Sequence, residues 1–177
     1  KLSLAFLFII PVILYAADNQ SITIGSFNIN NPENNTENKW VIIKEDQRHV
    51  IRHDSGYFAE VNHYTTEDVP AKITAIITDF KEANVALNIG VKSDSTENFG
   101  QNPVRHVIIE GNDAYAHLFL LVNNKELLEI RLFISKSSDA IYKEFTNFLA
   151  LIRINSSAQI SALPAEPANP PASETPQ

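Results

Sequence analysis

The sequence predicts an α+β fold, in which a mainly antiparallel sheet of about six strands carries one helix on each face. Three observations lead to this prediction. Short alternating or β-branched runs recur between turn residues, as in antiparallel hairpins. Two longer stretches instead place apolar residues at helical spacing. The central predicted strands are apolar on both faces, so each face needs a covering layer.

Composition limits the classes of function. The chain has 177 residues, a net charge of −7 and no cysteine. This length suits one folded domain. A dispersed acidic excess argues against a nucleic-acid partner and against a polybasic membrane-surface role. Without cysteine, disulfides, thiolate metal sites and cysteine nucleophiles are excluded.

The two ends of the chain differ from its middle. Residues 1–17 (KLSLAFLFIIPVILYAA) predict a signal peptide, with a basic start, an apolar run and small residues at a cleavage point. We expect cleavage, no stable membrane span afterwards and a periplasmic or secreted protein; an uncleaved N-terminal membrane anchor is the alternative. Residues 155–177 are rich in Pro, Ala and Ser and predict a disordered tail, either passive or partner-binding. Residues 18–154 form the predicted folded domain.

The first predicted elements are strands joined by polar segments. Residues 21–30 predict a strand interrupted at Gly25, residues 31–39 a loop, and residues 40–43 a further strand. Next comes a hairpin with strands 47–53 and 57–65, centred on Ser55. This centre predicts three facing pairs: His53 with Tyr57, Ile51 with Ala59, and His49 with Val61.

Residues 68–83 predict the first helix. Its apolar stripe consists of Ile73, Ile76, Ile77 and Phe80, and Thr66 or Asp68 is the expected cap, with Pro70 in the first turn. Residues 85–91 then predict a strand, and residues 92–102 a polar loop.

The last part predicts three consecutive antiparallel strands and a second helix. The strands are 104–109, 115–122 and 126–134, and a turn at Asn123-Asn124 would pair Val122 with Lys125. The helix is 138–152, capped by Ser137 or Ser138. Its stripe is Ile141, Phe145, Phe148, Leu149 and Ile152. The order is therefore β-β-β-α-β-β-β-α.

Histidines are the candidate metal ligands. His49 and His53 share a face of the predicted hairpin, and His63 lies diagonally across from His49. Neutral imidazoles on adjacent strands suit zinc or copper. Surface histidines on a polar strand face are the alternative, because no H-x-H or H-E-x-x-H spacing occurs. His117, between Tyr115 and Phe119, is expected to be a hydrogen-bonded core histidine.

The sequence predicts no enzyme. G-x-S-x-G and S-x-x-K patterns are absent. Ser55 follows His53 and Asp54, but we expect neighbours in a hairpin turn to point in different directions rather than to form a nucleophile–base–orienter line. A hydrolase assembled from distant residues is the weaker alternative.

Several segments together resemble the PsbP/DcrB family of exported α-β-α sandwich proteins, over about residues 22–154. The segments are Phe27-Asn28-Ile29 with Asn31-Pro32-Glu33 and Trp40, then residues 55–64, 69–80 and 111–121, and finally Ile141 to Phe145. The family is named for an extrinsic subunit of the photosynthetic oxygen-evolving complex. The resemblance implies a non-catalytic module that binds or stabilises another protein, and it transfers no catalytic residue.

We therefore expect an accessory module that docks on an envelope or periplasmic protein. The expected contact surface is the loop pair 31–39 and 92–102, with candidate contacts at Trp40, Asn34, Asn98 and Phe99. Burial of Trp40 in the core is the favoured alternative for that residue. The competing function is a periplasmic protein that binds a metal or small ligand through the hairpin histidines. The sequence leaves the oligomeric state open.

Overall fold

The computed structural model describes residues 21–30, 39–45, 48–85 and 90–155. The predicted signal peptide, nearly all of the loop 31–39 and nearly all of the tail lie outside the described residues. Within the described ranges the chain forms ten strands and two helices. The strands are β1 Ile22–Ile24, β2 Phe27–Ile29, β3 Trp40–Glu45, β4 Arg48–His53, β5 Phe58–Thr65, β6 Gly90–Phe99, β7 Asn102–Glu110, β8 Ala114–Asn123, β9 Glu126–Ser135 and β10 Ile152–Ile154. The helices are α1 Val69–Val85 and α2 Asp139–Leu149.

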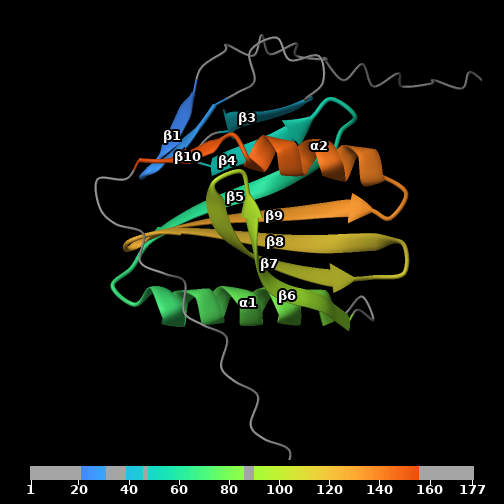
Figure 1. Cartoon of the computed structure of the whole chain (residues 1–177). Helices are drawn as coiled ribbons and strands as arrows, with labels where there is room; N and C mark the ends of the chain where they lie inside the picture. The colour runs from blue at the N-terminus through green and yellow to red at the C-terminus, as the bar shows by residue number, and fades with distance from the viewer. Residues whose placement is uncertain (1–20, 31–38, 46–47, 86–89, 156–177) are drawn as a thin grey trace, which may run out of the picture.

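The strands form two antiparallel sheets (Figure 1). The larger sheet has seven strands in the order β3-β4-β5-β9-β8-β7-β6, and the smaller has three in the order β1-β2-β10. The predicted α+β class with an antiparallel sheet is confirmed, with more strands than expected. As predicted, β7, β8 and β9 are consecutive antiparallel neighbours.

One helix covers each face of the large sheet (Figure 1). The predicted stripe of α1 is buried against β7, β8 and β9 in one core cluster. On the other face, α2 and the three-stranded sheet share a second cluster with β3, β4, β5, β8 and β9. Strands β8 and β9 contribute to both clusters through alternate residues, because successive side chains of a strand point to opposite faces.

The hairpin registers are partly as predicted. His49 faces Val61 and Ile51 faces Ala59, as expected from a turn centred on Ser55. The turn between β8 and β9 was placed one residue too early, since Asn123 pairs with Glu126 and the connecting residues are Asn124 and Lys125. Asn124 has the positive φ of 54°. This error shifts the pairing by two residues, so the predicted faces stay correct.

Two predicted elements are wrong near the middle of the chain. The predicted polar loop 92–102 is mostly strand β6, which pairs with β7 along its length. β6 is an edge strand with many exposed side chains, so it lacks the apolar alternation that identifies a strand. The predicted strand 85–91 fails at its start, because Val85 belongs to α1; residues 86–89 are outside the described part.

The three-stranded sheet was not predicted. Residues 21–30 form two strands that turn at Gly25, whose φ is 58°, rather than one interrupted strand. The second helix ends at Leu149, and Ile152 begins β10, where it pairs with Ile29. Ile152 is fully buried as expected, but as a strand residue.

The helix starts follow the capping prediction in part. Asp68 caps α1, because its Oδ1 accepts a hydrogen bond from the Ala71 amide at 2.9 Å. Ser138 is the N-cap residue of α2, but its side chain makes no capping hydrogen bond. Its hydroxyl instead lies 2.8 Å from the hydroxyl of Tyr57, which ties the start of α2 to β5's hairpin.

Packing of α2 should dominate stability on its side of the sheet. Phe148 is fully buried, whereas Phe133 is 51% exposed. We expect Phe148→Ala to lower the free energy of unfolding by about 3–5 kcal/mol, because it removes a buried ring and leaves a cavity. The matched change Phe133→Ala should cost less than about 0.5 kcal/mol. Urea unfolding followed by circular dichroism measures both, and equal losses would contradict this description of the core.

Candidate functional site

The three hairpin histidines predicted to bind metal lie in different environments. His53 is buried, His49 is half-buried and His63 is more exposed. His53 contacts Trp40 and α2, whereas His63 contacts the β1–β2 hairpin. Among the described residues, no group of three or more His, Cys, Asp or Glu side chains could hold a metal ion. The structure therefore does not assemble the predicted ligand set.

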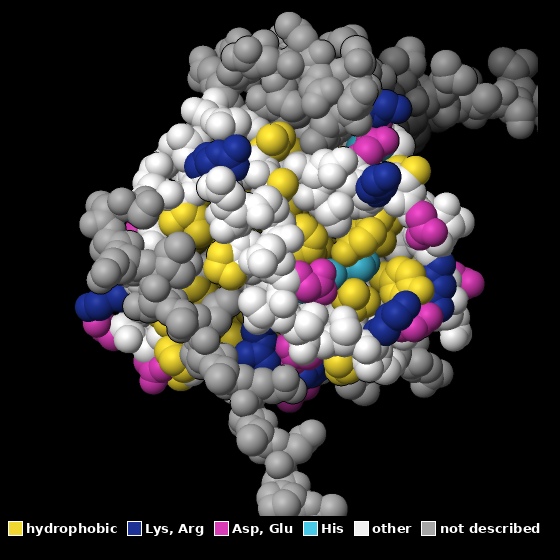
Figure 2. All heavy atoms as spheres, viewed as in Figure 1, with side chains coloured by type: hydrophobic (Ala, Val, Ile, Leu, Met, Phe, Trp, Pro, Cys, Tyr) yellow, Lys and Arg dark blue, Asp and Glu magenta, His cyan; other side chains and the backbone are white. Residues whose placement is uncertain are grey.

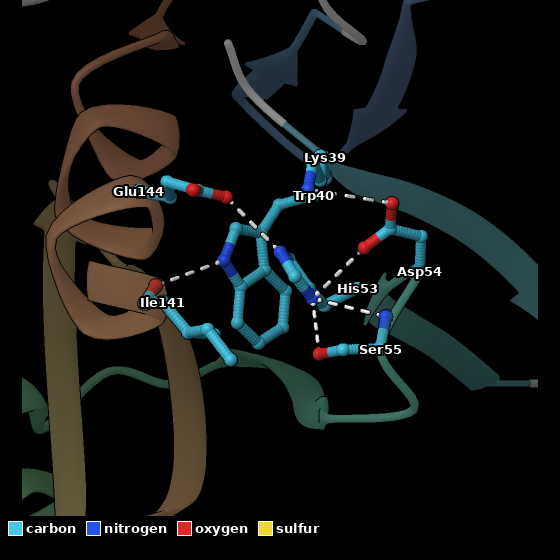
Figure 3. A network of polar contacts seen from close by, with 7 residues as sticks. All are labelled: Lys39, Trp40, His53, Asp54, Ser55, Ile141 and Glu144. Atoms are coloured by element: carbon cyan, nitrogen blue, oxygen red, sulfur yellow. Dashed lines mark hydrogen bonds and ion pairs between the residues drawn. The ribbon is translucent and has the colours of Figure 1, made fainter. Parts of the chain in front are cut away.

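His53 is the centre of a network between the first hairpin and α2 (Figure 3). Its Nε2 lies 3.0 Å from Oε2 of Glu144 on α2. Its Nδ1 accepts the backbone N–H of Ser55 at 3.1 Å and lies 2.5 Å from Oγ of Ser55. The carboxylate of Asp54 is 3.2 Å from the same nitrogen. Because Nδ1 accepts a backbone N–H, it carries no proton in the neutral ring, and Nε2 donates to Glu144.

Trp40 lies beside His53 in this network (Figure 3), with 5.0 Å between ring centroids. Its indole N–H donates to the carbonyl of Ile141 on α2 at 3.2 Å. The side chain is fully buried and also contacts Phe145. The core interpretation of Trp40 is therefore correct, and its proposed role as an exposed partner contact is wrong. Trp40 is the first residue of β3, and it pairs with His53, the last residue of β4. This pairing places both side chains next to α2.

Ser55, His53 and Asp54 form no nucleophile–base–orienter line, as expected, because Ser55 and Asp54 both approach Nδ1 of His53. The expectation that these neighbours point in different directions is wrong for Ser55, whose hydroxyl lies against the ring. A line of polar contacts does form with Glu144, an acid on α2 that lies 91 residues along the chain from His53 and was not considered. Such a line can polarise a hydroxyl. A neighbouring cavity of about 330 Å³ is lined by Gly56, Tyr57 and Phe58 but not by Ser55 or His53.

His63 belongs to the contact between the β1–β2 hairpin and β9. Its Nε2 lies 3.4 Å from Oε2 of Glu126, and the same carboxylate oxygen accepts the backbone N–H of Ser26 at 2.5 Å. A side chain at Gly25 would collide with both groups, since an added Cβ would lie 2.4 Å from the His63 ring. Hydrogen bonding with Ser26, with a smaller effect of His63, lowers the pKa of Glu126. His63 thus helps to seat the hairpin.

The other predicted partner contacts are only partly visible. Asn34 lies outside the described residues. Asn98 and Phe99 are at the end of edge strand β6, where Asn98 is exposed and Phe99 is half-buried. Phe99 packs edge-on against His106 and Phe119, so it also belongs to the core.

The structure contains a buried pair of histidines, His106 and His117, of which only His117 was predicted to be in the core. His117 is a hydrogen-bonded core histidine, as predicted, and its Nδ1 lies 3.0 Å from Nε2 of His106. Nδ1 of His106 lies 3.1 Å from the carboxylate of Glu97 on β6. Both histidines are nearly fully buried. The sequence contained a signal for this pair, namely histidines on neighbouring predicted strands, but their register was needed to join them.

Burial disfavours the charged form of both histidines. Together with smaller effects of His106 and Lys92, it lowers the pKa of His117 to about 3. Burial also lowers the pKa of His106, with the nearby Glu97 carboxylate acting in the opposite direction. His117 therefore stays uncharged across the physiological pH range.

A buried carboxylate supports the opposite face of the sheet. Glu129 is fully buried and accepts a hydrogen bond from the Tyr64 hydroxyl at 2.6 Å. Arg131 bonds Glu129 through Nε and reaches Asp79 on α1 at 3.1 Å. Burial and the bond to Glu129 raise the pKa of Tyr64. This network connects α1 to β9, and Arg131 is the last residue of β9 that takes part in it.

Beyond Arg131 the described residues leave the same face of the sheet uncovered. Phe58 on β5 is 56% exposed and Phe133 on β9 is 51% exposed. The two strands are neighbours, and both phenylalanines line the 330 Å³ groove together with Glu60 and Arg131. Phe133 also borders a second hollow of about 220 Å³. Phe58, Glu60, Arg131 and Phe133 are called the uncovered face below.

In the part of the chain that the structure describes, neither helix has the length and apolar content needed to cross a bilayer.

Comparison with known proteins identifies the fold. No family model matches the sequence, and no curated protein matches it. The structure is similar to the solution structure of cyanobacterial PsbP (CyanoP) from Synechocystis sp. PCC 6803, with a TM-score of 0.53 and 11% identity over 76% of this chain and 91% of that one. It also aligns with a crystal structure from Bacteroides thetaiotaomicron VPI-5482, with a TM-score of 0.47 and 15% identity over 75% of this chain and 46% of that one. The likeness to PsbP shows a PsbP-like fold, as the sequence resemblance implied.

The His53 network should be structural. We expect His53→Phe to lower the free energy of unfolding by about 1–3 kcal/mol, because the ring contact with Trp40 remains while Glu144 and Ser55 lose their partner. His49→Phe, on the same face of the same strand, is the control and should cost less. Thermal unfolding of the two variants measures the difference, and an unchanged His53→Phe protein would contradict the assignment.

Stability should fall in mild acid because of the buried histidine pair. The pKa of His117 in the folded protein, about 3, is below the ordinary histidine value of 6.5, so the unfolded chain binds a proton that the folded chain does not as pH falls below 6.5. The contribution of His117 to stability is therefore fully present above pH 6.5 and is lost progressively as the pH falls toward 3. One such proton is worth about 1.4 kcal/mol per pH unit. Urea unfolding at pH 7, 6 and 5 should show a smaller loss for His117→Phe; identical slopes would contradict this account.

Proposed function

We propose that this protein is an exported, non-catalytic accessory module that binds a protein partner in the cell envelope through the uncovered face. The observation that carries the proposal is the pair of exposed phenylalanines, Phe58 and Phe133, on one face of the sheet. Three large hydrophobic side chains are exposed among the described residues, and two of them meet here.

The chemistry of the uncovered face suits a protein partner. Aromatic side chains in a groove are typical anchors of protein interfaces, and a polar rim excludes water around them. Here Glu60 and Arg131 flank the two phenylalanines. Arg131 is held by Glu129 and Asp79, so the edge of the face next to α1 is fixed before a partner arrives.

This placement moves the expected contact surface. The sequence favoured the loops 31–39 and 92–102, but β6 replaces most of the second loop and Trp40 is in the core. The uncovered face lies instead on the sheet, at the ends of β5 and β9. It was not apparent from the sequence, because the point where α1 stops covering the sheet depends on the packing of the helix.

Fold and sequence pattern support an accessory role together. The PsbP-like fold agrees with the resemblance found in the sequence, and residues 1–17 have the pattern of a signal peptide. The Ser55–His53–Glu144 line joins the first hairpin to α2, which accounts for it without catalysis. The alternative of a zinc or copper site at His49, His53 and His63 gains no support from the geometry, because these side chains serve different contacts.

Site-specific photocrosslinking tests this proposal. A photoreactive residue at position 133 should give one reproducible crosslinked protein from envelope extracts of the source organism. The same residue at Ala75, exposed on α1, should not give that product. A product of equal yield at both positions, or none at position 133, would count against docking at the uncovered face.

A pair of surface substitutions gives the energetic prediction. The double variant Phe58→Ser, Phe133→Ser should keep the unfolding midpoint of the parent to within a few degrees, because both side chains are largely exposed. It should weaken binding of the crosslinked partner at least tenfold, since buried aromatic anchors contribute about 2 kcal/mol or more to an interface. Thr74→Ser, exposed on α1, is the control. Unchanged affinity of the double variant would refute this surface.

A further inference from the structure

Another cavity lies on the other side of the sheet, between the start of α2 and strands β6 to β9. Its volume is about 250 Å³. The wall is formed by Lys92, Ile108, Tyr115, His117, Ile134, Ser135, Asp139 and Tyr142. His117 and Ile134, exposed by 3% and 2%, are the most buried of these residues and form its floor. In Figure 2 a small histidine surface is visible below α2, among hydrophobic side chains and next to charged ones.

The hydrogen bonds behind this floor fix the tautomer of His117. The Glu97 carboxylate can only accept, so Nδ1 of His106 carries the proton between them. Nε2 of His106 is then an acceptor, and the proton between the two rings belongs to Nδ1 of His117. Nε2 of His117 is therefore left with a lone pair and no proton.

This lone pair has no protein partner. Nε2 of His117 is a buried polar atom without a hydrogen bond in the described part of the chain. Buried polar atoms are normally paired, and one left unpaired is costly. His117 belongs to the cavity wall, and its low pKa keeps the ring neutral, so its buried Nε2 is an unused acceptor next to the cavity.

We propose that this cavity binds a small, neutral aromatic compound whose single O–H or N–H group donates a hydrogen bond to Nε2 of His117. An apolar cavity of about 150 Å³ accepts benzene, so this larger one has room for a ring with one or two small substituents. Isoleucine and tyrosine side chains provide apolar and aromatic walls.

The charges of the wall favour a neutral ligand. Lys92 already lies 3.7 Å from Glu110 and 3.1 Å from the Tyr115 hydroxyl, and Asp139 adds a negative charge to the same wall. A carboxylate placed against Nε2 would oppose one acceptor to another. Tyr142 stacks on His117 with 4.4 Å between ring centroids, so a flat ligand can continue this arrangement of rings.

Two ligands of the same shape test the hydrogen bond directly. p-Cresol carries a hydroxyl where p-xylene carries a methyl group, so the pair differs in the donor and hardly in size. Titration followed by NMR of the unmodified protein should show p-cresol binding at least tenfold more tightly than p-xylene, with resonances of the cavity wall shifting. Equal affinities, or absence of p-cresol binding at millimolar concentration, would overturn the proposal.

Matched variants locate the effect. His117→Phe keeps an aromatic ring of similar size and removes the acceptor, so it should weaken p-cresol binding at least tenfold and leave p-xylene binding no weaker. His49→Phe makes the same change outside the cavity and should leave both affinities unchanged. Unchanged p-cresol affinity in His117→Phe would overturn the proposal.

A measurement on the unmodified protein covers the case in which His117→Phe does not fold. Long-range proton–nitrogen NMR spectra distinguish a protonated ring nitrogen from one with a lone pair. They should show Nε2 of His117 unprotonated between pH 5 and 8 and shifted by p-cresol. A protonated Nε2, or a nitrogen resonance that p-cresol leaves in place, would overturn the proposal.

Discussion

Strands β8 and β9 are buried on both faces over most of their length, and this constraint shapes the rest of the molecule. Leu118, Leu120 and Leu127 belong to one core cluster, while Phe119, Leu121 and Leu128 belong to the other. Burial of these side chains is the largest favourable contribution to folding, so each face must be covered. Helix α1 covers one face, and α2 with the three-stranded sheet covers the other. The uncovered face and the 250 Å³ cavity both lie where these covers end.

Polar groups in this structure occur at the junctions between layers. Glu144 joins α2 to His53, Asp79 joins α1 to Arg131, and Glu126 of β9 accepts the backbone N–H of Ser26 in the β1–β2 hairpin. Each junction pairs a carboxylate with a nitrogen atom from a distant part of the chain. Such pairs contribute modest energy compared with the core, but their geometry fixes how the layers are positioned.

The sequence predicted those features that depend on periodicity. Alternation along β8 and β9 gave the correct faces even though the turn was misplaced, because a two-residue shift preserves which side chains share a face. The apolar stripe of α1 was also predicted correctly, because it depends on the helical periodicity of the sequence. Strand β6 was missed because an exposed edge strand needs no apolar face, and β10 was missed because its buried Ile152 also continues the helical spacing of α2.

The candidate sites could be predicted much less well, because they depend on contacts between distant segments. Ser55 and His53 were recognised as a pair of suitable type, but Glu144 could be added only once α2 was placed. His117 was expected in the core, whereas its bond to His106 required the register of β7 and β8. Trp40 lies under α2 for the same kind of reason.

The three-stranded sheet also sets how the domain can be held. β1 and β10, the first and last strands, both pair with β2, and this small sheet packs on the same side of the large sheet as α2. Residues that precede β1 or follow β10 are thus joined to a single layer. A tether through either end would attach the domain by that layer. The α1 side, with Phe58 and Phe133, would then face away from the point of attachment.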